Sequence, residues 1–298
     1  MKVLVCDPIS ATAVQTMRAR GLEVDVRDTI TAEELLAEIP AYTAMVVRSR
    51  TKVTRAVLDA ASHLKVIVRG GVGVDNIDVA SAQAREVRVM NTPAASTDSV
   101  AELTLAYLLA LARPIVQATL SLKAGKWEKK KFSGAEIQGK TLGVIGTGRI
   151  GRAIARRAAA LGMRVLGYDV APGEPAPYLT MTTLDELLAQ SDYLTLHIPL
   201  LESTHHLVDA DLIAKMKDGV RLIHCGRGGV IDEDALYDAL VSGKVAGAAL
   251  DVFESEPPKD TRLFTLDQVI GSPHVGASTK EATARIGDEV AELLINFE

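Results

Sequence analysis

The sequence predicts an α/β protein in which parallel sheets are covered by helices on both faces. Short runs rich in β-branched residues alternate with helical stretches along the whole chain. These runs are continuously apolar, which is typical of strands that are buried on both faces. With 298 residues, the chain is long enough for two domains of roughly 150 residues each.

The expected strands form two series, and helical patterns lie between them. The first series comprises Lys2–Cys6, Glu23–Val26, Ala44–Val47, Lys65–Val68 and Val87–Met90. The second comprises Thr141–Ile145, Arg164–Tyr168, Tyr193–Leu196, Arg221–Ile223, Ala246–Leu250 and Gln268–Ile270. Clear helical patterns cover Ala11–Arg20, Ala32–Ile39, Ile150–Leu161 and Glu233–Ser242.

One helical stretch, Ser99–Arg113, is apolar nearly all round. A helix of that kind lies in a core or at a subunit interface. It is shorter than the roughly 18 apolar residues that a membrane span needs. The charged segment Lys123–Lys131, which holds the only Trp, favours a solvated connection.

The composition excludes several classes of protein. Hydrophobic residues make up 48% and charged residues 24%, so intrinsic disorder, collagen and disulfide scaffolds are not expected. The chain carries 33 basic and 38 acidic residues without a strongly basic block, so we expect no nucleic-acid partner. The first residues predict a strand rather than a signal peptide. Since only Cys6 and Cys225 are present, we expect a reducing, cytoplasmic location. Since no apolar run reaches the roughly 18 residues of a membrane span, we expect no membrane association.

A glycine-rich turn after Thr141–Ile145 predicts a dinucleotide site. Gly146, Gly148 and Gly151 fit the G-x-G-x-x-G pattern between a strand and a helix. The glycines permit the tight turn, the approach of a pyrophosphate and close helix packing, and the helix N-terminus attracts phosphate. Asp169 lies 23 residues after Gly146, where a carboxylate accepts hydrogen bonds from the ribose hydroxyls and repels a 2′-phosphate. The pattern therefore favours NAD; the alternative is that Asp169 only caps a loop.

Three polar residues follow later strands, at the edge where ligands bind in doubly wound sheets. These are Arg227 between glycines, Glu256 before Pro257, and His274 after Pro273. Hydride transfer from an alcohol needs a base for the hydroxyl proton, a cation for the carboxylate, and a group that holds the base. Singly, each residue has a structural interpretation: a surface arginine, a loop glutamate, and a hydrogen-bonded histidine.

No metal site is expected from the spacing. The adjacent His205 and His206 should point to different sides, and no Cys, Asp or Glu stands at metal-ligand spacing from them. Cys225 flanks the Arg227 turn, and we interpret it as a small packing residue that lines the cofactor site.

Five motifs resemble the D-isomer-specific 2-hydroxyacid dehydrogenase family. They are GVGVDNID (71–78), GKTLGVIGTGRIG (139–151), HCGRGGVIDEDAL (224–236), GAALDVFESEP (247–257) and SPHVGASTKEA (272–282). Within the family, MVVRSRTKVT (45–54), VMNTP (89–93), GKWEKKKF (125–132) and HVGASTKEA (274–282) are most similar to the members that oxidise D-3-phosphoglycerate. Longer members of that group carry regulatory domains after this core, so the sequence, which stops at Glu298, matches a short or truncated form.

The resemblance implies a Rossmann-type doubly wound parallel sheet inserted into a second, flavodoxin-like α/β substrate domain. The substrate domain would comprise residues 1–92 plus 275–298, and the NAD-binding domain residues 93–274. His274 would be the general acid/base, Glu256 would hold its ring, and Arg227 would bind the carboxylate. Ser99–Lys131 resembles the dimer-forming region, so we expect a homodimer.

The resemblance also implies a full set of site residues. Those at the cofactor NAD would be Gly146, Gly148, Arg149, Ile150, Gly151, Asp169, His197, Pro199, Thr204, Cys225, Arg227, Asp251, His274 and Gly276. Those at a phosphorylated 2-hydroxy acid would be Arg48, Arg69, Val72, Gly73, Val74, Asn91 and Lys129, the last reaching over from the partner subunit. Arg48 and Arg69 would lie at the rim of the cleft; the alternative is that both are salt-bridged structural residues. Two alternatives remain: a broader 2-hydroxyacid dehydrogenase such as a glyoxylate or hydroxypyruvate reductase, or a non-enzymatic NAD-sensing corepressor or scaffold.

Overall fold

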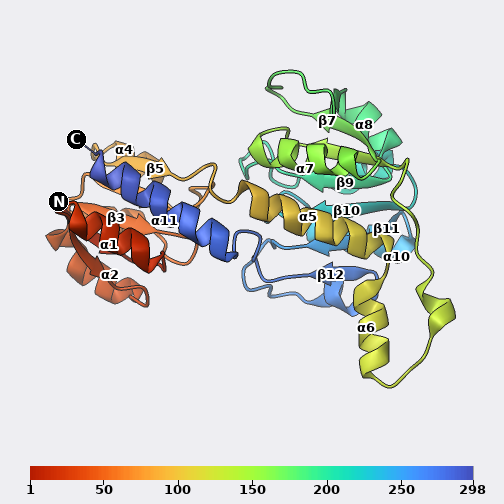
Figure 1. The fold of residues 1–298 in the computed structure, drawn as a ribbon, viewed down its shortest axis with the longest axis horizontal. Coiled ribbons are helices and arrows are strands. Elements are labelled where there is room, and N and C mark those ends of the chain that lie inside the picture. Colours follow the sequence, from red (N-terminus) through yellow and green to blue (C-terminus); the bar gives the residue numbers. More distant parts are fainter. Residues whose placement is uncertain (298) are drawn as a thin grey trace. The chain divides into compact units, whose positions relative to one another are not determined.

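The computed structural model describes residues 1–297, which form two compact units (Figure 1). Unit 1 comprises Met1–Thr97 and the segment from Ala277 onward, and unit 2 comprises Asp98–Gly276. The chain therefore crosses between the units slightly later than the expected boundaries at 92/93 and 274/275. The first shift arises because Ala95 O accepts a hydrogen bond from Arg285 Nε, at 2.9 Å, within unit 1. The second arises because Gly276 N donates to a carboxylate of unit 2.

Unit 1 is built on a five-stranded sheet in the order β2-β1-β3-β4-β5. All neighbouring strands are parallel, and this order is the flavodoxin-like one. The strands are β1 (Lys2–Val5), β2 (Glu23–Val26), β3 (Ala44–Val47), β4 (Val66–Arg69) and β5 (Arg88–Asn91). The helices are α1 (Ala11–Ala19), α2 (Ala32–Glu38), α3 (Arg55–Ala60), α4 (Val79–Gln83) and α11 (Lys280–Ile295), with a 3-10 turn η1 at Ile39–Ala41.

The helix α11 completes unit 1 by packing alongside α1 (Figure 1). Gly287 makes the close approach possible, since a Cβ there would lie 2.9 Å from Ala13 Cβ and would overlap Ser10 Oγ. Ile286 and Val290 of α11 are buried with the apolar residues of β1 and α1. One side of the unit 1 core therefore depends on a segment from the other end of the chain.

Unit 2 holds a seven-stranded parallel sheet in the order β12-β11-β10-β9-β6-β7-β8. The chain builds β6, β7 and β8 outward on one side and then returns to β9 on the other side of β6. The strands are β6 (Thr141–Ile145), β7 (Arg164–Tyr168), β8 (Thr180–Met181), β9 (Tyr193–Leu196), β10 (Val220–His224), β11 (Val245–Leu250) and β12 (Val269–Gly271). This reversal is a topological switch point, where ligands bind in doubly wound folds, and it confirms the predicted class. The two-residue strand β8 was not expected.

Helices cover this sheet as the sequence predicts. They are α5 (Thr97–Ala112), α6 (Ile115–Lys123), α7 (Arg149–Ala160), α8 (Leu184–Gln190), α9 (Ala210–Lys215) and α10 (Glu233–Ser242), with 3-10 turns η2 (Lys129–Phe132) and η3 (Arg262–Thr265). Eight of the 16 residues of α5 are buried, which agrees with the expected core position of one side of this helix. Within residues 1–297, no single helix is long and apolar enough to span a membrane. The pair α5 and α6 reaches that length and composition only when taken together, and the two helices are bent by 69° at the break between them.

Candidate active site

The glycine-rich turn joins β6 to α7 and leaves no room for side chains at two of its positions. Gly146 has a φ of 92°, and a Cβ there would lie 2.5 Å from the carbonyl oxygen of His197. A Cβ on Gly151 would overlap the carbonyl oxygen of Gly146. In contrast, a Cβ on Gly148 would meet nothing within 4 Å. The turn is therefore tightly packed on its inner side and open on its outer side.

The N-terminus of α7 lies at the open side of this turn. Gly148 is the N-cap, and it offers no side chain to the free N–H groups of the first turn. Arg149 is the exposed first residue of the helix, followed by Ile150. Uncapped N–H groups and the positive end of the helix dipole attract phosphate. The cradle thus fits the pyrophosphate of a dinucleotide.

Asp169 follows β7 beside the glycine-rich turn. One carboxylate oxygen accepts hydrogen bonds from Thr147 N at 2.7 Å and Thr147 Oγ1 at 3.3 Å, and the other from Ala171 N at 3.0 Å. The side chain therefore does cap the loop, which was the alternative interpretation of this residue. A carboxylate has about four acceptor sites, so one remains for a ribose hydroxyl.

His274 and Glu256 form a hydrogen-bonded pair in unit 2. His274 Nδ1 lies 2.7 Å from Glu256 Oε2, and both side chains are partly exposed. Burial raises the pKa of Glu256, but the hydrogen bond and charge of His274, together with Phe253 N–H and the charge of Arg227, lower it by more, so the net pKa lies below the usual value. His274 itself has a φ of 52°, a conformation that non-glycine residues rarely adopt. The imidazole is thus held at Nδ1 and leaves Nε2 for another partner.

A pocket of about 450 Å³ opens beside this pair. Glu256 and His274 line it together with apolar side chains, of which the largest are Phe253 and Phe264. The apolar surroundings limit the water that can compete for the polar groups of the pair.

Arg227 is carried by the turn after β10. A Cβ on Gly228 would overlap the carbonyl oxygen of Phe253, so the glycine lets this turn pack against the segment that leads to Glu256. The carbonyl oxygen of Arg227 lies 2.6 Å from the ring Nε2 of His224. The charge of Arg227 adds a smaller lowering contribution to the pKa of Glu256. The structure therefore brings together the three residues that the sequence singled out.

Two histidines lie behind these turns at the ends of β9 and β10, of which His224 is buried and His197 is half-buried. Burial lowers the pKa of His197 to about 3 and that of His224 to about 4, so both are neutral. His197 Nε2 lies 2.8 Å from Thr195 Oγ1, so this expected cofactor residue is held inward. The loop beyond it is closed by Thr204 Oγ1, which donates to Pro199 O at 2.6 Å. Cys225 is a buried free thiol, as expected for a packing residue.

Asp251 and Gly276 lie beneath the His274 turn. Asp251 is 1% exposed and follows β11 directly. Its carboxylate accepts hydrogen bonds from Val275 N and Gly276 N, both at 2.8 Å. These two expected cofactor residues therefore also support the backbone that carries His274.

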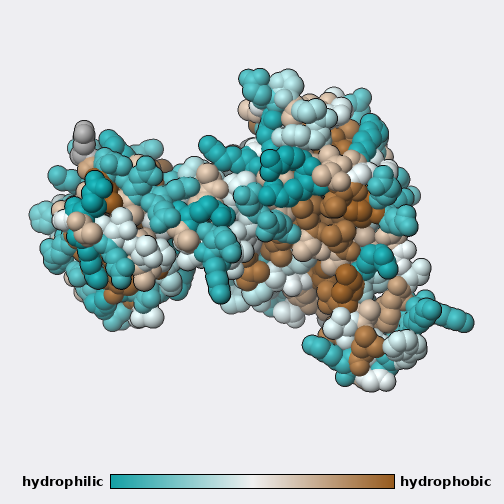
Figure 2. All heavy atoms as spheres, viewed as in Figure 1, coloured by the Kyte–Doolittle hydropathy of each residue, from teal (hydrophilic) through white to brown (hydrophobic). Residues whose placement is uncertain are grey.

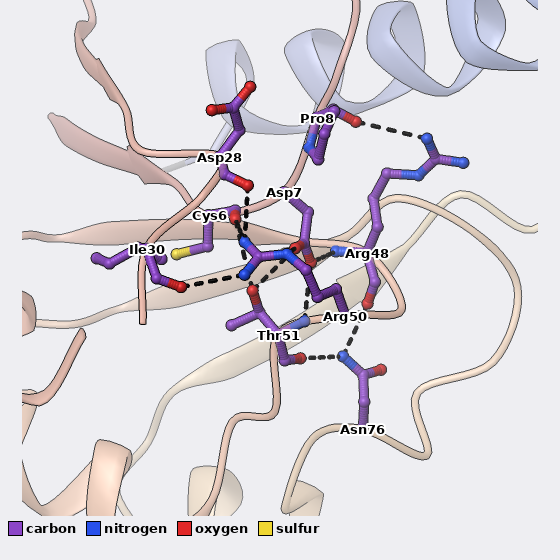
Figure 3. Close-up of polar contacts among 9 residues, drawn as sticks. All are labelled: Cys6, Asp7, Pro8, Asp28, Ile30, Arg48, Arg50, Thr51 and Asn76. Carbon is purple, nitrogen blue, oxygen red and sulfur yellow. Dashed lines mark hydrogen bonds and ion pairs between the residues drawn. The ribbon is translucent and has the colours of Figure 1, made fainter. Parts of the chain in front are cut away.

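In unit 1, the segment 48–51 is clamped from two sides (Figure 3). The buried carboxylate of Asp7 accepts hydrogen bonds from Arg48 N, Thr51 N and Thr51 Oγ1. On the other side, Asn76 Nδ2 donates to Arg48 O at 2.8 Å and Thr51 O at 2.7 Å. The Arg48 side chain extends away from Asp7 toward Pro8 O, 3.4 Å from Nη1. The clamp fixes the backbone and leaves the Arg48 side chain without a carboxylate partner among the contacts drawn.

Arg50 differs from Arg48 because its guanidinium is fully engaged inside unit 1 (Figure 3). It donates to the carbonyl oxygens of Asp28 at 2.8 Å, Ile30 at 3.0 Å and Cys6, and its Nε lies 3.0 Å from Asp7 Oδ1. Arg50 therefore belongs to the scaffold of unit 1, and the role of Arg48 at a substrate stays a prediction.

Arg69 departs from the expectation of a guanidinium at the rim. It is the last residue of β4 and is only 7% exposed. Nη1 donates to Gly70 O at 3.3 Å and Nη2 to Ser49 Oγ at 3.4 Å, and a Cβ on Gly71 would overlap Nη1. The side chain folds back over the two glycines that follow the strand, because they leave it space.

The remaining expected substrate residues are divided between the units. Asn91, at the end of β5, donates from Nδ2 to Val72 O and so fastens the loop that contains Gly73 and Val74. Lys129 lies in unit 2 as an exposed residue of η2.

The structure corrects the expectation for His205 and His206. Their rings are stacked, with centroids 3.9 Å apart. His206 also lies with Asp232 and Glu254, whose ligand atoms are all within 4.8 Å of one another. Sequence spacing missed this group because Asp232 caps α10 and Glu254 follows β11. Such a group could hold a metal ion by geometry, but His206 Nε2 already lies 2.9 Å from Glu254 Oε1.

Comparison with protein families gives one match over more than half of the chain. Residues 105–276 match the family model described as "D-isomer specific 2-hydroxyacid dehydrogenase, NAD binding domain". The match covers the glycine-rich turn, Asp169 and the three residues Arg227, Glu256 and His274.

Two relatives represent the curated proteins to which the sequence is similar. It is 52% identical over 296 residues to D-3-phosphoglycerate dehydrogenase of Methanocaldococcus jannaschii, covering 98% of this chain and 56% of that protein. It is 49% identical over 295 residues to hydroxypyruvate reductase of Thermotoga maritima, covering 98% of this chain and 96% of that protein. The chain thus spans about half the length of the phosphoglycerate dehydrogenases it matches.

Solved structures resemble the whole chain. A glyoxylate reductase from Paecilomyes thermophila matches with a TM-score of 0.92 at 31% identity, covering 100% of this chain and 96% of that one. A D-lactate dehydrogenase from Aquifex aeolicus, complexed with NAD and lactic acid, matches with a TM-score of 0.87 at 32% identity, covering 100% and 95%.

Proposed function

We propose, from the premise that this chain belongs to the D-isomer specific 2-hydroxyacid dehydrogenase family, that it oxidises D-3-phosphoglycerate to 3-phosphohydroxypyruvate with NAD. The observation that carries the chemistry is the His274–Glu256 pair, at 2.7 Å, beside the Arg227 turn. The choice of substrate is supported by identities of 50–52% to two archaeal phosphoglycerate dehydrogenases. This reaction is the first step from glycolysis toward serine.

Arg227, Glu256 and His274 each have a separate role in this reaction. NAD, held at the glycine-rich turn and Asp169, supplies the hydride acceptor. His274 takes the proton of the C2 hydroxyl at Nε2 and returns it in the reverse direction. Glu256 holds Nδ1 and stabilises the protonated ring, and Arg227 binds the carboxylate as a planar fork.

In this proposal Arg48 gives the enzyme its preference for phosphate, assisted by Arg69 and by Lys129 of the partner subunit. The clamp by Asp7 and Asn76 holds the Arg48 backbone, which lowers the entropy cost of binding an anion there. Arginine binds phosphate in a bidentate geometry that lysine does not reproduce.

A panel of 2-oxo acids tests the proposal. NADH oxidation is measured with 3-phosphohydroxypyruvate, hydroxypyruvate, glyoxylate, pyruvate and 2-oxoglutarate, and kcat/KM should be highest for the phosphorylated acid. Arg48→Ala should raise KM for 3-phosphohydroxypyruvate by about tenfold or more, because a charge-assisted hydrogen bond contributes about 1.5–3 kcal/mol. KM for hydroxypyruvate should change little. Arg48→Ala/Arg69→Ala should nearly abolish the preference.

A second candidate function is a hydroxypyruvate reductase. It is favoured by the Thermotoga maritima relative, 96% of whose length is covered, whereas only 56% of the Methanocaldococcus jannaschii relative is. Equal efficiency of the unmodified enzyme on hydroxypyruvate and its phosphorylated form would support this candidate. NADH binding without turnover of any acid would support an NAD-sensing scaffold.

We further propose that the protein is a cytoplasmic homodimer formed through α5, α6 and the segment up to Lys131. Large apolar side chains are exposed there, including Ile115, Leu120 and Trp127, and hydrophobic residues gather on this part of unit 2 (Figure 2). A cytoplasmic location is supported by the two buried free cysteines, which form no disulfide.

A further inference from the structure

We infer that Tyr107 and Ser272 are positioning residues for His274, acting through the carboxylate of Asp251; the inference rests on the proposed role of His274 as general acid/base. Tyr107 lies on α5, Ser272 directly follows β12, and Asp251 directly follows β11. All of them belong to unit 2. A polar chain therefore runs from the helix layer to the turn that carries His274.

The turn is fastened on both sides of His274. On the N-terminal side, Ser272 Oγ donates to Asp251 Oδ1, and Ser272 N donates to Leu250 O at 3.0 Å. On the C-terminal side, the backbone N–H groups of Val275 and Gly276 donate to the same carboxylate. One buried side chain thus holds residues before and after the imidazole.

The carboxylate of Asp251 is held by hydrogen bonds from Ser272, Val275 and Gly276. It is 1% exposed, and within residues 1–297 no Lys, Arg or His forms an ion pair with it. A buried carboxylate without a cation depends strongly on each donor, because losing one leaves part of the charge unsatisfied. Removing the Ser272 donor should therefore loosen the whole turn.

Tyr107 sets the direction of the hydrogen bonds that run from its hydroxyl through Ser272 to Asp251. Its hydroxyl donates to Ser272 Oγ, which leaves the serine proton free to point at Asp251. Burial raises the pKa of Tyr107 to about 12, so the hydroxyl keeps its proton over the pH range in which the enzyme would be assayed. Consecutive hydrogen bonds polarise one another and strengthen the chain.

The network fixes the backbone of His274, whereas the Glu256 contact fixes only its ring. Glu256 fixes one ring nitrogen, but the backbone of His274 has a φ of 52°, which costs free energy for a non-glycine residue. The surrounding bonds to Asp251 hold the backbone in that conformation. Side-chain and backbone anchors together fix the direction of Nε2, and a small misplacement of a proton donor has a large effect on rate.

Tyr107→Phe tests this inference with Tyr193→Phe as the matched control. Tyr193 is also buried in unit 2, and its hydroxyl has no hydrogen-bond partner within residues 1–297. In the full-length enzyme with NADH and 3-phosphohydroxypyruvate, Tyr107→Phe should lower kcat by roughly three- to tenfold. The solvent deuterium isotope effect on kcat should rise, because proton transfer becomes slower. The fall in kcat should exceed any change in the dissociation constant of NADH, and Tyr193→Phe should resemble the unmodified enzyme in every measurement.

Ser272 provides a second pair of variants. Ser272→Ala should lower kcat by roughly ten- to a hundredfold, and Ser272→Thr, which keeps the hydroxyl, should restore most of the rate. In Ser272→Ala, hydrogen–deuterium exchange at the amides of Val275 and Gly276 should accelerate. The inference is overturned if Tyr107→Phe changes the isotope effect no more than Tyr193→Phe. It is also overturned if the variants weaken NADH binding and leave kcat unchanged.

The amide exchange separates this inference from the proposed function. If the unmodified enzyme turns over no 2-oxo acid, the proposed function fails, whereas the exchange at Val275 and Gly276 still reports whether Ser272 holds the turn. If the enzyme turns over normally and Ser272→Ala leaves both exchange and kcat unchanged, only the inference about the network fails.

Discussion

At the residue scale, Asp169 is expected to decide the choice between NAD and NADP. Its carboxylate stands at the edge of the dinucleotide cradle, where a 2′-phosphate would meet a like charge. Asp169→Asn keeps an acceptor for Thr147 N but removes the charge. We expect the kcat/KM ratio of NAD to NADP to fall by about tenfold or more, equivalent to about 1.4 kcal/mol. An unchanged ratio would show that this carboxylate serves only as the loop cap.

Glu256 should set the pH dependence of the enzyme. Its pKa lies below the usual value of 4.5, so its ionised form is favoured in the folded protein. The stability that ionised Glu256 adds to the folded protein is fully present above the ordinary carboxyl pKa. It is lost as pH falls through the lowered pKa of Glu256. Glu256→Gln removes the charge beside the imidazole. The pH above which NADH oxidation declines should therefore move to lower values, measured as kcat against pH. A superimposable profile would contradict the assignment of Glu256 as the group that stabilises the protonated ring.

At the scale of elements, α6 is expected to form part of the dimer interface. Leu120 is 61% exposed on this helix, and a second copy of the chain would bury it. Leu120→Asp should place a charge in that interface and give a monomer in sedimentation-velocity experiments. Val241→Asp is the control, because Val241 is equally exposed at 61% but lies on α10. A dimer that persists in Leu120→Asp, or a monomer in the control, would count against this surface.

The order of strands and helices could be predicted from the sequence because apolar strands and turn glycines leave a strong local pattern. The strand β8 could not, since two residues carry no periodicity. The polar function of α5 was also hidden. The apolar residues of this helix predict only that it is buried. The fold places the Tyr107 hydroxyl against Ser272, which is 165 residues away in the sequence.

Contacts between distant residues account for the other differences in the site. The glycine-rich turn and the motifs around Arg227, Glu256 and His274 were visible as local patterns. The inward fold of Arg69 depends on Ser49 in another strand connection, and the group around His206 depends on Asp232 and Glu254. Such long-range pairs are set by tertiary packing, which a single sequence does not display.

At the scale of the whole molecule, the two units should differ in their dependence on α11. Gly287→Leu places a side chain where α11 meets α1, against Ala13 and Ser10, so it should destabilise unit 1 by about 1–3 kcal/mol or more. Unit 2 has its own apolar core, so NADH binding should persist. Thermal unfolding of the variant should show an earlier transition. Ala284→Leu, on the exposed side of the same helix, should leave the transition in place.

Unit 1 is built from two separate segments of the chain, so its parts are synthesised at different times on the ribosome. The five strands of that unit emerge first, but α11, which covers α1 and one side of the sheet, emerges only after the whole of unit 2. During that interval Val14 and Met17 of α1 lack the α11 residues that share their apolar cluster in the finished protein. A nascent chain with such an uncovered apolar surface is a substrate for chaperones and is prone to aggregation. Unit 2, although second in the chain, is therefore the first to reach its complete native fold during translation.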